Sequence, residues 1–63
     1  MSNQFRENLT KAQHAAGFAE QDIRAAMEIA GPVESLILQD ALRDAVAVYD
    51  RLTRLIAAVE DAE

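Results

Sequence analysis

The stretch Ala30-Gly31-Pro32-Val33, near the middle of the 63-residue sequence, decides the fold. Glycine suits the left-handed backbone position just past a helix end, and proline suits the first turn of the next helix, where its missing N–H costs nothing. The pair therefore predicts a turn between two helices, one over about residues 3–30 and the other over about 33–61. We expect an all-α antiparallel helical hairpin that forms a single domain over residues 1–63.

Upstream of this turn, apolar or small residues recur with an alternating spacing of four and three, which is typical of a heptad stripe along one helix. The stripe consists of Phe5, Leu9, Ala12, Ala16, Ala19, Ile23, Ala26 and Ala30. Gly17 lies inside this segment, and glycine in a helix interior costs about 1 kcal/mol relative to alanine. Because the register continues past Gly17 without a shift, we expect one continuous helix, with a break at Gly17 and a three-helix arrangement as the alternative.

The second helix is expected to carry a wider apolar face. Its heptad stripe consists of Leu38, Ala41, Ala45, Val48, Leu52, Leu55 and Val59. Five further residues widen the stripe on both flanks, namely Ile37, Leu42, Val46, Tyr49 and Ile56. Together they cover about half of the helix circumference, whereas contact with one neighbour needs a stripe of roughly 100°. We therefore expect the hairpin to be completed to a four-helix bundle or by a partner protein.

The apolar residues that the first helix cannot cover define the predicted protein interface. Small alanines on the first helix allow the second helix to approach closely, which would leave the strip of Leu42, Val46, Tyr49 and Ile56 exposed. The full set of predicted interface residues is Leu38, Leu42, Val46, Tyr49, Leu52, Ile56, Val59 and Phe18. Phe18 belongs to this set because it falls off the heptad stripe and needs a bend or a partner to cover it.

Size and composition narrow the class of protein. A chain this short buries only about 60% of the surface that its unfolded form exposes, so small domains commonly rely on disulfides, a metal or oligomerisation. The sequence has no cysteine and a single histidine, which leaves self-association or a protein partner as the expected support.

A net charge of −5 disfavours nucleic acid and anionic membranes as partners. Residues 1–7 lack the apolar core of a secretory signal, and we expect a cytoplasmic protein.

The ionisable residues do not form an arrangement typical of catalysis. His14 has Thr10 and Phe18 at helical spacings rather than a carboxylate, so an acid–base pair is not expected. Asp40 and Asp44 are four residues apart, and two carboxylates on an open helix face make only a weak cation site. We expect a non-enzymatic protein with no catalytic, cofactor-binding or metal-binding residues and no small-molecule substrate.

Three segments resemble the small helical-hairpin co-chaperones of the type III secretion needle subunit. They are Gln4-Phe5-Arg6-Glu7-Asn8-Leu9, Ile23-Arg24-Ala25-Ala26-Met27 and Ala41-Leu42-Arg43-Asp44-Ala45-Val46-Ala47-Val48. The segment between Gly31 and Ala41 would be shorter than in that family. The resemblance implies a bacterial hairpin that joins a helical-repeat chaperone and helps to keep the needle subunit unpolymerised in the cytoplasm.

In architecture, the chain also resembles the plasmid-encoded ROP-type RNA-binding hairpins, which share its length, its central turn and a dimeric four-helix bundle. Their RNA-binding face is basic, whereas the basic residues of the first helix here are interrupted by acidic ones, which weakens attraction to phosphate. The main hypothesis is therefore an adaptor, co-chaperone or inhibitor that binds a partner by helix-in-groove recognition. A homodimeric RNA-binding regulator and a structural subunit of a larger assembly are the alternatives.

Overall fold

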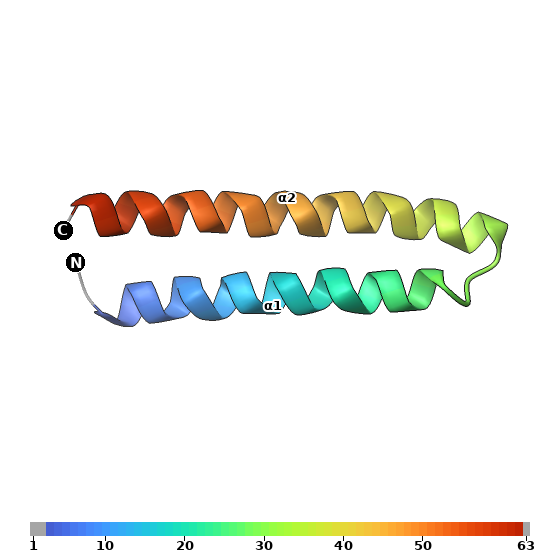
Figure 1. The fold of residues 1–63 in the computed structure, drawn as a ribbon, viewed down its shortest axis with the longest axis horizontal. Helices are drawn as coiled ribbons and strands as arrows, with labels where there is room; N and C mark the ends of the chain where they lie inside the picture. The colour runs from blue at the N-terminus through green and yellow to red at the C-terminus, as the bar shows by residue number, and fades with distance from the viewer. Residues whose placement is uncertain (1–2, 63) are drawn as a thin grey trace.

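A computed structural model describes residues 3–62, which form two long antiparallel α-helices joined by a short turn. Helix α1 spans Asn3–Met27 and helix α2 spans Pro32–Ala62. Figure 1 shows the helices side by side along their whole length, with the turn at one end of the molecule. This confirms the all-α helical hairpin. The single-domain prediction extends over residues 1–63, of which 1, 2 and 63 lie outside the described residues.

Helix α1 runs without interruption through Gly17, so the three-helix alternative is wrong. The helix ends at Met27, three residues earlier than the sequence pattern predicts. The amides of Glu28, Ile29 and Ala30 each donate to the carbonyl three residues before, at 3.3, 3.2 and 3.4 Å. Such bonds tighten the final turn of a helix and satisfy carbonyls that would otherwise have no partner. The residues after Met27 therefore belong to a tight terminal turn instead of a further α-helical turn.

Gly31 begins α2 instead of closing α1, which corrects the role expected from the sequence. None of the glycines in the described residues has a positive φ, so Gly31 is not in the left-handed conformation. Its carbonyl accepts the first α-helical bond from the Ser35 amide at 2.9 Å, and its own amide donates to Oε1 of Glu34 at 3.1 Å. This is the acidic half of a capping box, with Pro32 at the first helical position as expected.

Two contacts between the helices define their register. The side-chain amide Nε2 of Gln13 donates to Oγ1 of Thr53 at 2.8 Å. A Cβ atom added to Gly17 would lie 3.4 Å from Cε2 of Tyr49, so the tyrosine ring lies directly against the backbone of α1. Moving four residues forward along α1, from Gln13 to Gly17, therefore corresponds to moving four residues back along α2, from Thr53 to Tyr49.

The face of α1 that contacts α2 is rotated from the predicted heptad stripe. Leu9, Ile23 and Ala30 are half-buried and Ala16 is buried, as the stripe requires. The other contact positions are occupied by half-buried Gln13, Glu20 and Met27, whereas Ala12, Ala19 and Ala26 are exposed. The physical reason is the size of the Tyr49 ring, which fits against Gly17 and brings that side of α1 toward α2.

The flanks of α2 are exchanged relative to the prediction. Leu42 and Ile56, assigned to the uncovered strip, are half-buried toward α1. Val48 and Leu55, assigned to the contact with α1, are instead 43% exposed each. This exchange accompanies the rotation of α1, because turning Tyr49 toward Gly17 brings Leu42 and Ile56, seven residues away on either side, onto the same line.

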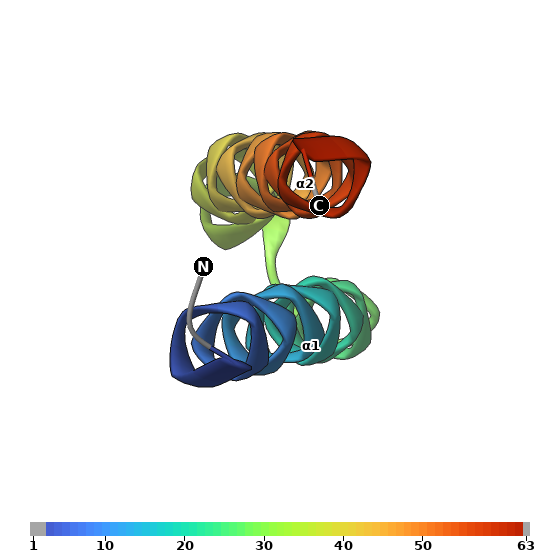
Figure 2. The ribbon, with the colours of Figure 1, turned by 90° about the vertical axis from the view of Figure 1, so that its left-hand side faces the viewer.

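The hairpin by itself has almost no core. Among the residues whose burial is described, only Ala16 and Val59 are buried, and none has less than 2% of its surface exposed. The radius of gyration is 14.6 Å, against about 11 Å for a compact domain of this length. Figure 2, which looks along the molecule, shows the two helices with no third segment of the described chain beside them. Each helix therefore has a large part of its circumference open to solvent.

Candidate interaction surface

The two broad sides of the hairpin differ in character. One side, the tyrosine face, contains Gln13, Gly17, Val46, Tyr49 and Thr53. It is held by the Gln13–Thr53 hydrogen bond and by the packing of Tyr49 on Gly17. The Thr53 hydroxyl also donates to the Tyr49 carbonyl at 2.9 Å. One interhelical hydrogen bond and the packing of an aromatic ring on a glycine therefore occupy this side.

The opposite side is apolar and is named here the alanine face. It consists of Ala12, Ala19 and Ala26 from α1 and Ile37, Ala41, Val48 and Leu55 from α2. In each helix, the helical rotation of about 100° per residue places these residues on one side of the line of contact with the other helix. The residues of the tyrosine face lie on the other side of that line. Since the helices are antiparallel, the two flanks lie on the same side of the molecule.

On the alanine face, two of the three alanines of α1 lie level with a larger residue of α2. The register set by Gln13 and Gly17 places Ala12 near the level of Leu55 and Ala19 near that of Val48. Ala26 lies near the level of Ala41 by the same register. Alternation of small and large apolar side chains leaves a surface on which further helices can pack closely.

None of the seven residues of the alanine face is charged, and two charges of α2 lie at its outer edge. These are Asp44 and Arg51. Neither has an opposite charge three or four residues away on its own helix. Other charges on the helices do pair locally, with Arg24 at 2.9 Å from Glu20 and Arg54 at 2.9 Å from Asp50. Within the part of the chain that the structure describes, Asp44 and Arg51 form no ion pair.

A further group of exposed apolar side chains lies at the turn end of the hairpin. Ile29 is 90% exposed and Val33 is 71% exposed, and Leu36 and Ile37 follow in the first turns of α2. At the other end of the molecule Phe5 is 41% exposed. Apolar surface therefore extends along the alanine face to both ends.

The predicted interface residues divide into two groups. Half-buried Leu38, Leu42, Leu52 and Ile56, together with buried Val59, belong to the contact between α1 and α2. Val46, Tyr49 and Phe18 are exposed to 42%, 40% and 65%. The sequence interpretation missed the alanine face because it assigned most of those residues to the hairpin contact. The signal that could have found the face is the fit of a large Tyr49 ring against Gly17.

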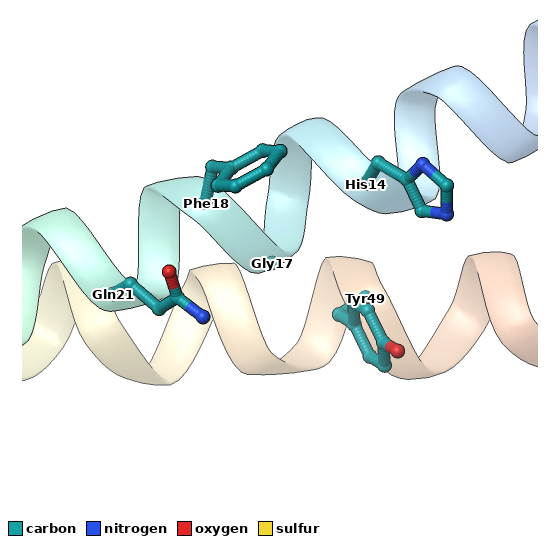
Figure 3. A pocket seen from close by; sticks show the side chains of 5 residues that line it. All are labelled: His14, Gly17, Phe18, Gln21 and Tyr49. Atoms are coloured by element: carbon teal, nitrogen blue, oxygen red, sulfur yellow. The ribbon is translucent and has the colours of Figure 1, made fainter.

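An open depression lies beside Tyr49, lined by His14, Gly17, Phe18, Gln21 and the tyrosine ring (Figure 3). Its volume is about 190 Å³, which is smaller than the roughly 300–1,000 Å³ of typical ligand pockets. Figure 3 shows Phe18 directed away from α2 and the tyrosine ring opposite Gly17. His14 has no carboxylate among these neighbours, so this depression offers no acid–base pair.

The helices contain neither a cluster of potential metal ligands nor a membrane-spanning segment within the described residues. Within residues 3–62 no three histidine, cysteine, aspartate or glutamate side chains converge as they would around a metal ion. Across the same residues neither helix contains a stretch that is long and apolar enough to span a bilayer. The alanine face, an exposed apolar surface built from both helices, is the candidate functional surface of the hairpin.

No protein-family model, curated protein or solved structure matches the chain.

Proposed function

We propose that the protein is a non-enzymatic interaction module that acts by burying its alanine face against helices of another chain. The observation that carries this proposal is a continuous uncharged apolar surface, built from both helices, on a molecule with almost no core of its own. Contiguous exposed apolar patches on soluble proteins generally mark interaction sites. An adaptor, co-chaperone or inhibitor acts stoichiometrically in this way.

The same module would suit the co-chaperone role implied by the resemblance to needle-subunit co-chaperones, and that role remains a prediction. The RNA-binding alternative receives less support from the charges. Of the basic residues of α1, Arg24 is paired with Glu20 at 2.9 Å, which reduces its attraction for phosphate. Asp22 and Glu28 on the same helix add further negative charge.

Two valines of α2 provide a matched test of this function. Val48 lies on the alanine face and is 43% exposed, whereas Val46 lies on the tyrosine face and is 42% exposed. Val48→Asp places a charge in the proposed interface, and Val46→Asp places the same charge at an equally exposed site outside it. Tagged wild type and both variants are expressed in cells of the native host, and associated proteins, including the untagged chain itself, are quantified by mass spectrometry.

We expect association to fall at least about tenfold in Val48→Asp, because an unpaired charge buried in an apolar interface is strongly unfavourable. Val46→Asp should retain its associated proteins. Equal recovery with wild type and Val48→Asp, or selective loss in Val46→Asp, would show that the alanine face is not the functional surface.

A further inference from the structure

The hairpin exposes more surface than a compact monomer of its mass, and the excess is close to the area that one partner buries in a protein interface. The chain exposes 4704 Å², whereas a compact monomer of 6.9 kDa exposes about 4,000 Å². The excess of about 700 Å² is close to the roughly 800 Å² that each partner buries in a stable interface of ordinary size. One partner of about the same dimensions is therefore enough to cover the surplus, and the following inference rests on the function proposed above.

The alanine face is arranged symmetrically about its centre. On α1, Ala12 and Ala26 lie seven residues to either side of Ala19, and on α2, Ala41 and Leu55 lie seven residues to either side of Val48. Ala19 and Val48 themselves lie near the same level. A surface that binds another copy of itself in a closed pair must be self-complementary, with residue i contacting residue j and j contacting i, and this even spacing is compatible with that requirement.

A two-fold axis that crosses the face through Ala19 and Val48 stacks α1 on α1 and α2 on α2 of the second copy, with each pair antiparallel. Val48 then meets Val48 of the second copy, and Ala41 lies level with Leu55. The small residues Ala12, Ala19 and Ala26 allow the two α1 helices to approach closely, while the larger residues of α2 fill the remaining space. The result is a four-helix bundle.

Charge complementarity selects this orientation. With Val48 on the axis, Asp44 of each copy lies beside Arg51 of the other, so the two charges that lack local partners meet as two symmetric ion pairs. If the copies were instead related by an axis parallel to the helices, α1 would stack on α2. Asp22 would then lie level with Asp44 of the other copy, and like charges would repel.

The ends of the molecule favour the same orientation. The antiparallel stacking carries Phe5 of one copy to the level of the turn in the other, where Ile29 and Val33 are strongly exposed. Apolar groups at opposite ends of the hairpin would then cover one another. In the alternative orientation Phe5 would lie near Asp61 of the second copy, and the two turns would lie together.

We propose that the alanine face is occupied by a second copy of this chain, related by a two-fold axis through Ala19 and Val48. The sequence has no cysteine, so a single introduced cysteine reports on this axis without interference. Val48→Cys should form a disulfide between copies under mild oxidation, because equivalent atoms meet on a two-fold axis. Val46→Cys, on the tyrosine face, is the matched control and should remain largely uncrosslinked.

Mass and charge measurements complete the test. Sedimentation equilibrium of wild type should give twice the monomer mass of 6.9 kDa. Asp44→Arg and Arg51→Asp alone should each raise the dimer Kd by about tenfold, since each replaces two ion pairs with two repulsions. The double variant Asp44→Arg with Arg51→Asp should restore the Kd of wild type.

Three results would overturn the two-fold pairing. They are a wild-type monomer at about 100 μM, crosslinking of Val46→Cys in place of Val48→Cys, and efficient disulfide formation only between Ala19→Cys and Val48→Cys chains in a mixture. A monomer that still loses its associated proteins on Val48→Asp would leave the interaction module standing with a different occupant. A monomer whose associations are unchanged by that substitution would remove both proposals.

Discussion

At the scale of single residues, Gly17 and Tyr49 determine how the helices face one another. A glycine in the middle of a 25-residue helix weakens that helix, yet α1 passes through it without a break. The compensation is contact, because the absence of a side chain lets the tyrosine ring lie against the α1 backbone. The pair thereby fixes both the rotation of α1 and the side of the hairpin that is left apolar.

Substitutions at Gly17 separate its effect on helix propensity from its effect on the contact with Tyr49. A Cβ at this position would lie 3.4 Å from the tyrosine ring, which is close to an ordinary van der Waals contact. Gly17→Ala should therefore stabilise the protein by about 0.5–1 kcal/mol through its higher helix propensity. Gly17→Leu should destabilise it by about 1–3 kcal/mol, because its side chain would push the helices apart.

Urea unfolding followed by circular dichroism, at one fixed protein concentration, measures both changes. Ala25→Gly, at an exposed position of the same helix, calibrates the effect of propensity alone, with an expected loss of about 1 kcal/mol. A Gly17→Leu variant as stable as Gly17→Ala would mean that Tyr49 does not pack on this position in solution.

At the scale of the elements, the start of α2 depends on a single carboxylate. Glu34 accepts a hydrogen bond from the Gly31 amide, one of the backbone groups that a helix leaves unsatisfied at its beginning. Its negative charge also lies at the positive end of the helix dipole. Glu34→Ala removes both contributions, and we expect a loss of about 0.5–2 kcal/mol by thermal or urea unfolding.

Glu34→Gln separates the hydrogen bond from the charge, because the amide oxygen still accepts from Gly31. We expect its stability to lie between that of wild type and Glu34→Ala, with the remaining deficit reduced at high salt. Identical stability of wild type and Glu34→Ala would show that the cap contributes nothing to the hairpin.

The two helices could be predicted from sequence to within three residues at each boundary, because heptad spacing and a central Gly-Pro pair are local signals. The rotation of each helix about its own axis, which decides the face that it turns toward the other helix, could not be predicted from these signals. On α1 the hydrophobic pattern favours Ala12 over the polar Gln13, although the structure places Gln13 in the contact. On α2 apolar residues flank both sides of the contact line, so Val48 and Leu42 are comparable choices for a one-dimensional pattern. The decision comes from the shape of Tyr49 against Gly17, which is a contact between residues 32 positions apart. The predicted role of Gly31 was wrong for a different reason: its amide donates to the side chain of Glu34 only three residues later, a local signal that marks the start of α2.

At the scale of the whole molecule, the proposed pairing would couple stability to assembly. A hairpin with two buried residues among those described has little apolar burial of its own to offset the entropy of ordering its chain. If the alanine face is covered by a second copy, folding draws on the interface, and unfolding converts one dimer into two separated chains. The melting temperature should then depend on protein concentration.

The size of that dependence can be estimated. Two 63-residue chains unfold with an entropy of roughly 0.26 kcal/mol/K, and a tenfold change in concentration shifts the apparent stability of a dimer by about 1.4 kcal/mol. We therefore expect the melting temperature to rise by about 5 °C for each tenfold increase in concentration, as measured by circular dichroism between 2 and 200 μM (roughly the accessible range). Val46→Asp should show the same slope. A melting temperature independent of concentration would mean that the hairpin is stable as a single copy, and an apolar surface left open in that state would then have to serve a different partner.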